Sequence, residues 1–304
     1  LGNGAMSNSI PEIEDSKCLL IFGYNPAVTH PIVARRIIKA KEKGAKIITA
    51  DPRFTEQVKI SDLWLPLKNG TNMALVNALA YVLLTENLYN KEYVEKYTEG
   101  FAAYKKVVME YSPEEVAPLV GISAKDIRAA ARMYAAAPSA TILWGMGVTQ
   151  FGQAVDVVQG LASLALLTGN LGRPHVGVGP VRGQNNVQGA CDMGALPNVY
   201  PGYQSVEDPA IRKKFEAAWG VSLPEKRGVC LTEVPHLARE GKIKAYYIFG
   251  EDPVQSDPDA NGIRAALDAM EFVIVQDIFM NKTALHADVI FPATSWGEHE
   301  GVYS

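Results

Sequence analysis

Near its start the chain carries the stretch Leu19-Leu-Ile-Phe-Gly-Tyr-Asn-Pro26, and far downstream it repeats this pattern as Tyr246-Tyr-Ile-Phe-Gly-Glu-Asp-Pro253. In both copies an apolar run ends in Phe-Gly, followed by one further residue, an Asn or Asp, and a Pro. A short apolar run without alternation is typical of a strand buried on both faces, and the Gly and Pro mark its end. The two stretches therefore predict two copies of a buried parallel strand.

The similarity continues into a second strand in each copy. A helical pattern follows the first run, and a second apolar run then ends in an aspartate, Asp51 in the first copy and Asp277 in the second. The distance from Gly23 to Asp51 is 28 positions, and the distance from Gly250 to Asp277 is 27. The nearly equal spacing indicates a repeated strand-helix-strand unit.

A third match follows eleven residues beyond each aspartate, where Asp62-Leu-Trp-Leu-Pro66 corresponds to Asp288-Val-Ile-Phe-Pro292. Three matched elements in the same order are hard to attribute to chance. They predict two β-α-β-loop-β units, each with parallel strands joined by right-handed crossovers. The predicted fold class is therefore α/β, with mainly parallel sheets flanked by helices.

Polar residues and glycines fall at the carboxyl ends of these strands, where open parallel sheets bind ligands. They are Gly23, Asn25 and Asp51 in the first unit, and Gly250, Asp252 and Asp277 in the second. Glycine lets the backbone approach a phosphate, a helix N-terminus offers free N–H groups, and an acidic side chain can accept from a ribose or a guanine. The repeat is equally compatible with a duplicated scaffold in which these residues serve as turn glycines and helix caps.

Between the units the chain is richly helical. Residues 71–86 and 123–136 have apolar residues at helical spacing, and Ser123-Ala-Lys-Asp126 resembles a capping box. Residues 139–147 then predict another buried strand, followed by a helix from about 152 to 168. The string Gly145-x-Gly147-x-x-Gln150 lacks the third glycine of the dinucleotide fingerprint, so it gives little support for nicotinamide binding.

Residues 182–204 fit neither a helical nor a strand period, and they combine amides and glycines with the single arginine Arg182. Such a segment is costly to order unless its polar groups bind something. It lies where the two halves of the chain meet, so we expect it to contribute to a ligand site. The alternative is a long surface loop.

Composition narrows the classes of partner. A chain of 304 residues with 48% hydrophobic residues predicts two domains, placed at residues 1–182 and 183–304. The net charge of −4 disfavours nucleic acid as a partner, and no apolar run is long enough for direct membrane insertion. The three cysteines, Cys18, Cys191 and Cys230, are too far apart for a Cys-x-x-Cys site and suit a reducing, cytoplasmic location. Both ends suggest a piece of a longer polypeptide.

Three strings in the middle of the chain resemble those of the molybdopterin-dependent formate dehydrogenase α subunits, which belong to the molybdopterin oxidoreductase superfamily. The strings are Leu143-Trp-Gly-Met-Gly-Val-Thr-Gln150, Leu167-Thr-Gly-Asn-Leu-Gly-Arg-Pro174 and Arg182-Gly-Gln-Asn-Asn-Val-Gln-Gly-Ala-Cys-Asp-Met-Gly194. The resemblance covers the whole chain and includes Thr294-Ser-Trp-Gly-Glu-His-Glu-Gly301 near its end.

The resemblance implies two molybdopterin guanine dinucleotides that hold one metal, Mo or W. Each dinucleotide would be bound by one of two pseudo-symmetric α/β domains, an arrangement that the repeat matches. The implied activity is the oxidation of formate to CO2, with electrons passed to a [4Fe–4S] cluster in a part upstream of this chain. The implied partners are electron-transfer subunits or a hydrogenase.

The resemblance also assigns site residues. Arg182 would bind the formate carboxylate through paired charged hydrogen bonds, with Gly183 and Gln184 beside it against the pterin. Asn72 stands where many superfamily members have Asp. The implied contacts to one dinucleotide are Gly23, Asn25, Asp51, Gly70, Asn72 and Gly147, and those to the other are Gly250, Glu251, Asp252, Gln276 and Asp277.

No metal ligand is predicted within this chain. The family's metal-binding cysteine or selenocysteine precedes the first repeat, so Cys191 is not expected to bind the metal. The five histidines are isolated in sequence and are expected to be structural or surface residues: His30, His175, His236, His286 and His299. Two alternatives stay open, namely another molybdopterin oxidoreductase, such as a nitrate reductase or a formylmethanofuran dehydrogenase, and a cofactor-free paralogue that serves as scaffold or electron-transfer subunit.

Overall fold

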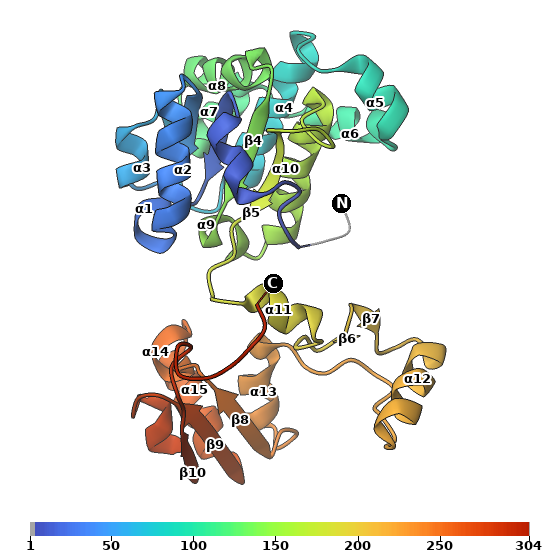
Figure 1. Ribbon diagram of the computed structural model, residues 1–304. Coiled ribbons are helices and arrows are strands. Elements are labelled where there is room, and N and C mark those ends of the chain that lie inside the picture. Colours follow the sequence, from blue (N-terminus) through green and yellow to red (C-terminus); the bar gives the residue numbers. More distant parts are fainter. Residues whose placement is uncertain (1–3, 304) are drawn as a thin grey trace. The chain divides into compact units, whose positions relative to one another are not determined.

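The computed structural model describes residues 4–303, and the chain divides into two compact units, Leu1–Asn185 and Asn186–Ser304 (Figure 1). Each unit contains its own parallel sheet with helices packed against it. The predicted α/β class is confirmed. Among the helices of the described residues, none combines the length and the apolar composition that a membrane span requires.

The first unit is built on a five-stranded sheet in which every neighbouring pair of strands is parallel. The order of strands is β3-β2-β1-β4-β5, so the first strand of the chain lies in the middle. All residues of β1 and β4 are buried, as expected for strands covered on both faces. The strands are β1 (Cys18–Phe22), β2 (Lys46–Ala50), β3 (Leu63–Leu65), β4 (Ala140–Trp144) and β5 (Gly177–Pro180).

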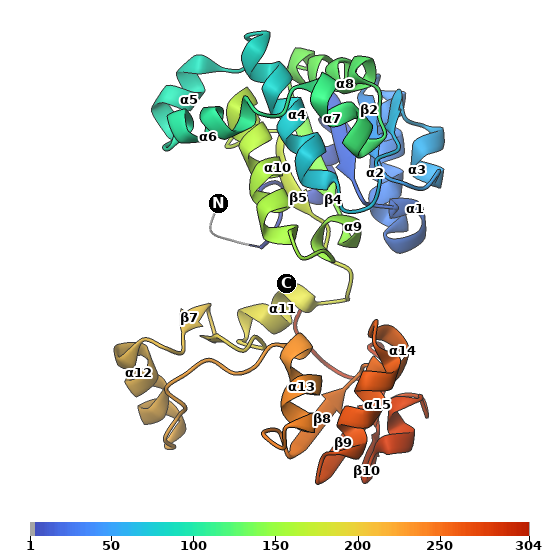
Figure 2. The ribbon, with the colours of Figure 1, turned by 180° about the vertical axis from the view of Figure 1, so that it is seen from behind.

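Helices cover both faces of this sheet (Figures 1 and 2). Alternate residues of β1 enter two separate cores: Leu19 and Ile21 pack with α2, while Leu20 and Phe22 belong to the core that contains α4, α8 and α10. The helices are η1 (Ile10–Asp15), α1 (Pro26–Thr29), α2 (Pro31–Glu42), α3 (Glu56–Lys59), α4 (Asn72–Thr85), α5 (Lys91–Tyr97), α6 (Phe101–Val108), α7 (Pro113–Val120), α8 (Ala124–Ala136), α9 (Met146–Thr149) and α10 (Ala154–Thr168).

The helices predicted at 71–86, 123–136 and 152–168 are confirmed as α4, α8 and α10. At the start of α8, the side chain of Ser123 accepts a hydrogen bond from the backbone N–H of Asp126, as the capping pattern predicts. The short helix α9, directly after β4, was not predicted. Gly145 and Gly147 made this stretch resemble the end of a strand and its turn.

The second unit contains a three-stranded parallel sheet in the order β10-β9-β8. Helices pack on one face of this sheet, where Ile248, Val273 and Val275 form a core with Ile263 and Leu267 of α15. Its elements are α11 (Val187–Asp192), β6 (Val199–Tyr200), β7 (Gln204–Ser205), α12 (Pro209–Trp219), η2 (Leu231–Glu233), α13 (Val234–Arg239), β8 (Ala245–Phe249), α14 (Pro253–Ser256), α15 (Ala260–Asp268), β9 (Phe272–Asp277), η3 (Thr283–His286) and β10 (Val289–Pro292).

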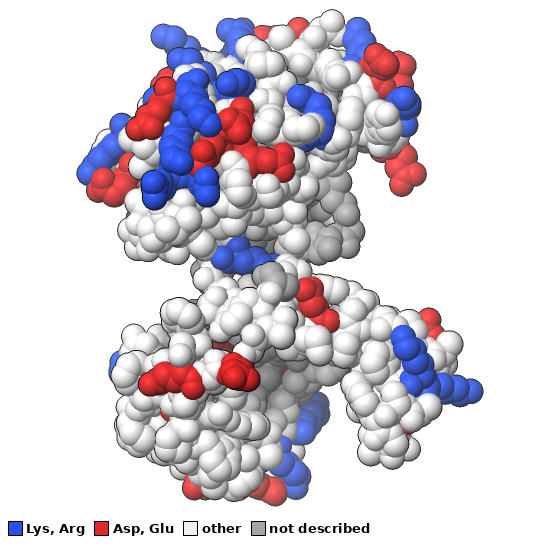
Figure 3. Space-filling view, viewed as in Figure 1, with Lys and Arg blue, Asp and Glu red and all other residues white. Residues whose placement is uncertain are grey.

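The opposite face of this sheet is open to solvent. Tyr247 is 53% exposed, Phe249 70% and Phe291 48%, and in β8 the two exposed side chains lie on either side of the buried Ile248. In the space-filling view the sheet side of this unit is largely uncharged (Figure 3). In the first unit, by contrast, charges of both signs are intermixed over α2 and η1, where Glu14 pairs with Arg36 and Lys39.

The internal repeat is confirmed down to single hydrogen bonds. Gly23 N–H donates to the carbonyl of Ala50 over 2.9 Å, and Gly250 N–H donates to the carbonyl of Gln276 over 2.8 Å. Likewise, the carboxylate of Asp62 accepts from Ile47 N–H at 2.8 Å, and that of Asp288 accepts from Val273 N–H at 2.7 Å. The third matched element is therefore a strand whose leading aspartate joins it to the second strand.

The description of residues 182–204 as irregular was wrong in part. Residues 187–192 form α11, in which the Gln188 amide donates to the Asp192 carboxylate one turn away. Tyr200 lies in β6, is buried, and stacks on Phe215 of α12 at a ring distance of 4.6 Å. The sequence did not predict this helix because it is short and contains Gly189, and because Asn186 before it has a left-handed backbone.

Glu12 links η1 to the segment before β5. Its carboxylate accepts from the backbone N–H of His175 at 3.0 Å, from the Asn8 amide at 3.0 Å and from Ser9 N–H at 3.2 Å. The hydrogen bond from His175 is the largest of the effects that lower the pKa of Glu12 from 4.5 to about 2.

Because the pKa of Glu12 is lower in the folded state, its stabilising effect is complete above the unfolded value and is lost as the pH falls through the folded value. We expect Glu12→Gln to unfold at a lower denaturant concentration than the wild type at pH 7, and this difference to shrink as the pH falls from 4.5 towards 2. Denaturation midpoints of both proteins across this range measure the effect. An unchanged difference at pH 3 would contradict the assignment.

Candidate functional site

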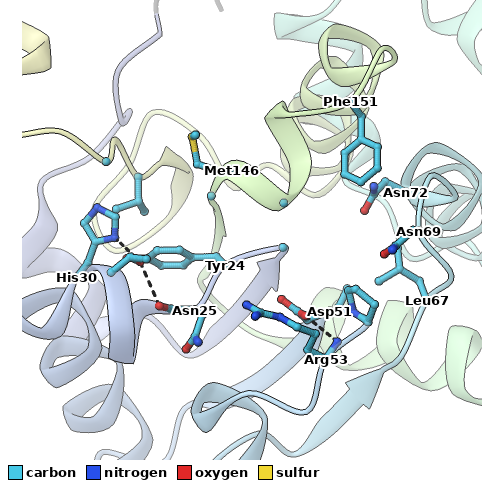
Figure 4. A pocket seen from close by; sticks show the side chains of 18 of the residues that line it. Tyr24, Asn25, His30, Asp51, Arg53, Leu67, Asn69, Asn72, Met146 and Phe151 are labelled. Carbon is cyan, nitrogen blue, oxygen red and sulfur yellow. Dashed lines mark hydrogen bonds between the residues drawn. The ribbon is translucent and has the colours of Figure 1, made fainter. Parts of the chain in front are cut away.

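A pocket of about 280 Å³ lies at the carboxyl end of the first sheet (Figure 4). The ends of β1, β2 and β4 and the start of α4 contribute to its wall. Its volume is near the lower end of the roughly 300–1,000 Å³ typical of small-molecule sites. Six of the residues predicted from the sequence line it, namely Gly23, Asn25, Asp51, Asn72, Gly147 and Gly183.

Gly23 and Gly147 bring the ends of β1 and β4 into direct backbone contact. Gly147 N–H donates to the Gly23 carbonyl over 3.0 Å. A Cβ atom on Gly147 would lie 2.7 Å from both the Cα and the carbonyl oxygen of Gly23, closer than real contacts allow. Both glycines are therefore required by the packing of the two strand ends, a reason that the sequence did not suggest.

Asn25 and Asp51 lie along one side of the pocket with Arg53 (Figure 4). The Asn25 side-chain oxygen is buried and accepts no hydrogen bond from any residue of the described chain, 4–303. An unpaired buried acceptor of this kind costs about 1–3 kcal/mol unless a donor reaches it. Asp51 is 5% exposed, and one carboxylate oxygen accepts from Arg53 N–H at 2.8 Å.

Asn72, Asn69 and Phe151 face the pocket from another side (Figure 4). Asn72 is the first residue of α4 and is 6% exposed. Gly70 lies in the turn before this helix, with a positive φ of 82°, but it does not line the pocket. The side chain of Arg53 gives the wall a cation, which suits an anionic ligand, whereas the Lys68 ammonium donates to the Pro118 carbonyl at 3.0 Å.

Arg182 follows β5 at the rim of this pocket, between Val181 and Gly183, which both line it. The backbone N–H of Val181 donates to the Trp144 carbonyl at 2.9 Å, and the guanidinium of Arg182 donates from Nε to the Gly4 carbonyl at 3.2 Å. The Arg182 carbonyl is 2.6 Å from Nε2 of His30. Gln184 is exposed and does not line the pocket.

The predicted residues of the second unit lie at the ends of β8 and β9. Gly250 has a φ of 65°, a conformation that favours glycine. Asp277 accepts from Phe279 N–H at 2.9 Å, as Asp51 does from Arg53. Gln276 accepts from the hydroxyl of Tyr247, and Glu251 is exposed.

Asp252, the counterpart of Asn25, is engaged within its own unit. Its carboxylate accepts from the N–H groups of Lys282 and Thr283 and, at 2.6 Å, from the Thr283 hydroxyl. Burial raises the pKa of Asp252, but the hydrogen bonds with Thr283 and Lys282 outweigh burial, so that the pKa is lowered overall. The two units therefore differ at this position: the side-chain oxygen of Asn25 has no hydrogen-bond partner, whereas the Asp252 carboxylate binds the loop at Lys282 and Thr283.

With this geometry established, comparison with known proteins identifies the family. The model of the molybdopterin oxidoreductase family matches residues 2–304. The chain belongs to this family. Membership in the molybdopterin oxidoreductase family implies a molybdopterin cofactor that carries Mo or W.

Curated relatives make the comparison more specific. The chain is 60% identical to formate dehydrogenase H of Escherichia coli over 305 residues, which cover all of this chain and 43% of that protein. It is 48% identical to the F420-dependent formate dehydrogenase subunit alpha of Methanocaldococcus jannaschii over 304 residues, which cover all of this chain and 45% of that subunit. The resemblance to formate dehydrogenases is confirmed, and the chain spans less than half the length of these relatives.

A solved structure agrees in fold. Acetylene hydratase from Pelobacter acetylenicus matches 95% of this chain and 44% of its own chain, with a TM-score of 0.74 and 23% sequence identity. At this identity the match supports the arrangement of elements and carries no argument about the reaction.

The first-unit pocket has groups that can bind the organic part of a molybdopterin cofactor. The unpaired Asn25 oxygen needs a donor, which an N–H group of the cofactor can supply, and Arg53 suits an anionic group. Among the His, Cys, Asp and Glu side chains of residues 4–303, no group of three or more is placed to hold a metal ion.

The sequence interpretation missed His30 and Arg53. Both line the pocket, yet His30 was expected to be only a structural or surface residue. The available signal was position, because His30 follows the first Gly-x-Asn-Pro stretch by four residues and Arg53 follows Asp51 by two. Residues that follow the end of a parallel strand so closely are candidates for the ligand site.

Proposed function

We propose that this chain is the central, cofactor-binding part of the catalytic subunit of a formate dehydrogenase, and that its two units are the two dinucleotide-binding domains. The observation that carries the proposal is the place of Arg182, whose neighbour Gly183 lines a pocket suited to a nucleotide. The similarity to proteins named formate dehydrogenases supports it.

In this proposal the first unit holds one molybdopterin guanine dinucleotide. The Asn25 oxygen and the Asp51 carboxylate accept from the guanosine, and Asn72 and the backbone near Gly23 and Gly147 complete the wall. Gly70 shapes the turn before Asn72. The second unit holds the other dinucleotide near Gly250, Glu251, Gln276 and Asp277, while Asp252 fixes the adjoining loop.

Arg182 binds the substrate. A guanidinium can donate two parallel hydrogen bonds to formate, which fix the carboxylate and offset its charge. Gly183 and Gln184 pack beside it against the pterin. The oxidation of formate to CO2 releases one proton and two electrons, and the bound molybdenum or tungsten supplies the two-electron redox chemistry. The chain's own residues orient formate so that its C–H bond faces the metal.

A [4Fe–4S] cluster, held by a part of the protein outside this chain, would supply the route for these electrons to electron-transfer subunits or a hydrogenase. The proposed location is the cytoplasm.

The full-length protein, purified without oxygen and loaded with cofactor, tests the activity. We expect formate-dependent reduction of a viologen dye together with Mo or W in the preparation. If the loaded protein reduces nitrate but leaves formate unchanged, it has the activity of another molybdopterin oxidoreductase. If it binds no cofactor, it is a scaffold.

The unpaired oxygen of Asn25 gives a sharper test of the nucleotide site. If the cofactor donates to it, Asn25→Leu should weaken guanine nucleotide retention about tenfold, measured as GMP released by acid hydrolysis per mole of full-length protein. If nothing binds there, leucine removes a buried unsatisfied oxygen, and the variant should unfold at a higher temperature with its GMP content unchanged.

A further inference from the structure

His30 connects two parts of the first unit that are 152 residues apart in the sequence. It lies between α1 and α2, and its Nε2 is 2.6 Å from the backbone carbonyl of Arg182. A carbonyl oxygen can only accept, so Nε2 must carry the proton and donate. The 2.6 Å separation is shorter than most N–H···O hydrogen bonds.

The other side of the His30 ring is also held. Nδ1 is 2.8 Å from the Thr29 hydroxyl, which in turn lies 3.1 Å from the Asn25 carbonyl. The ring centroid is 5.4 Å from that of Tyr24, at an interplanar angle of 57°. Tyr24, Asn25, Thr29 and His30 all line the pocket, so the ring is fixed by the wall of the proposed nucleotide site.

The backbone on the two sides of Arg182 is anchored differently. Before it, Val181 N–H is bonded to the Trp144 carbonyl as a continuation of the sheet. At Arg182 itself, the carbonyl is held by a side chain from another element. Beyond it, Gly183 and Gln184 are exposed. The hydrogen bond from His30 thus lies where the regular ladder of β5 has ended.

We propose that His30 is a positioning residue: by donating to the Arg182 carbonyl, it fixes the backbone from which the substrate-binding guanidinium extends. This inference rests on the proposed function, because it takes Arg182 to bind formate. The inference also connects the nucleotide pocket with the substrate site. The His30 ring, which binds the Arg182 carbonyl, is itself in contact with Thr29 and Tyr24 of the pocket wall.

Three variants of the full-length, cofactor-loaded enzyme test the role. His30→Phe keeps a ring beside Tyr24 and removes the donor, His30→Gln restores an N–H donor without the ring, and His236→Phe is the control, since His236 is an exposed residue of α13. We expect His30→Phe to raise the KM for formate about tenfold, with kcat and cofactor content changed little. His30→Gln should recover most of the loss.

Hydrogen exchange gives a readout that is independent of formate. Exchange of the backbone amides in residues 182–185 should become several-fold faster in His30→Phe and stay near wild type in His30→Gln and His236→Phe. Unchanged exchange in His30→Phe would refute the anchoring role. If exchange is faster in His30→Phe but its KM for formate is unchanged, and Arg182→Ala abolishes turnover, the positioning role is refuted.

A failure of the proposed function has a different signature. In that case Arg182→Ala would leave formate turnover unaffected, or the wild-type protein would have none. The exchange measurement would still show whether His30 holds the Arg182 backbone. A joint decrease of kcat and cofactor content in His30→Phe, without recovery in His30→Gln, would assign His30 to the fold and overturn the proposal.

Discussion

Arg182→Ala in the full-length enzyme should lower kcat/KM for formate by about 10²- to 10³-fold, the range measured when a positioned charge-stabilising donor is removed from an active site. Alanine removes the fork that would hold the carboxylate and offset its charge. The cofactor content should stay near normal, because the proposed nucleotide contacts come from other residues. Steady-state dye reduction, together with Mo or W and GMP analysis, measures both quantities.

Two matched variants sharpen this test. Arg182→Lys keeps the charge but cannot form the paired hydrogen bonds, so it should recover only part of the activity. Arg264→Ala removes a half-buried arginine of α15 in the second unit, whose guanidinium donates to the Asn261 side chain, and should leave turnover unchanged. Normal formate turnover in a cofactor-replete Arg182→Ala enzyme would refute the assignment of Arg182.

Gly147→Ala should strongly destabilise the first unit. The added Cβ would lie 2.7 Å from two backbone atoms of Gly23, which no side-chain rotation can relieve. Forced overpacking of this kind costs about 3 kcal/mol. In a unit of this size the thermal midpoint should fall by roughly 6–12 °C, and the cofactor content should fall with it because these strand ends form the pocket wall.

Gly152→Ala is the control, because a Cβ at Gly152 would meet no atom within 4 Å and the backbone φ is not positive. Its midpoint should stay within a degree or two of the wild type. Calorimetry of the full-length protein distinguishes the two glycines. A Gly147→Ala protein as stable as Gly152→Ala would show that the strand ends can separate at little cost.

Much of the fold could be predicted from the sequence because the strand-helix-strand pattern occurs in two copies. The matched apolar runs and the aspartates beside them predicted both strand-helix-strand units. In the structure, Asp62 and Asp288 each accept a hydrogen bond from a backbone N–H of the neighbouring strand. The extension of the first sheet to five strands by β5 was less accessible. Gly177-Val-Gly-Pro180 contains two glycines and a proline, which do not resemble a strand, and tertiary packing overrides that local preference.

For the site, the sequence identified residues but not their contacts. Asn25 and Asp252 occupy matching positions, yet one has an unpaired buried oxygen and the other caps a loop, a difference set by Thr283 thirty-one residues away. His30 carries no motif, and its role depends on the Arg182 carbonyl that the fold brings to it. Such pairings depend on distances in space that no local pattern records.

The strand order of the first sheet also has a consequence for synthesis on the ribosome. β1 is central and pairs with β4, so that Cys18 is matched with Ala140. Until β4 has emerged, one edge of β1 has unpaired backbone groups beside fully apolar side chains, the kind of edge that recruits other chains. The nascent protein must therefore keep this edge shielded while more than a hundred further residues are made, and its yield should respond strongly to chaperone supply.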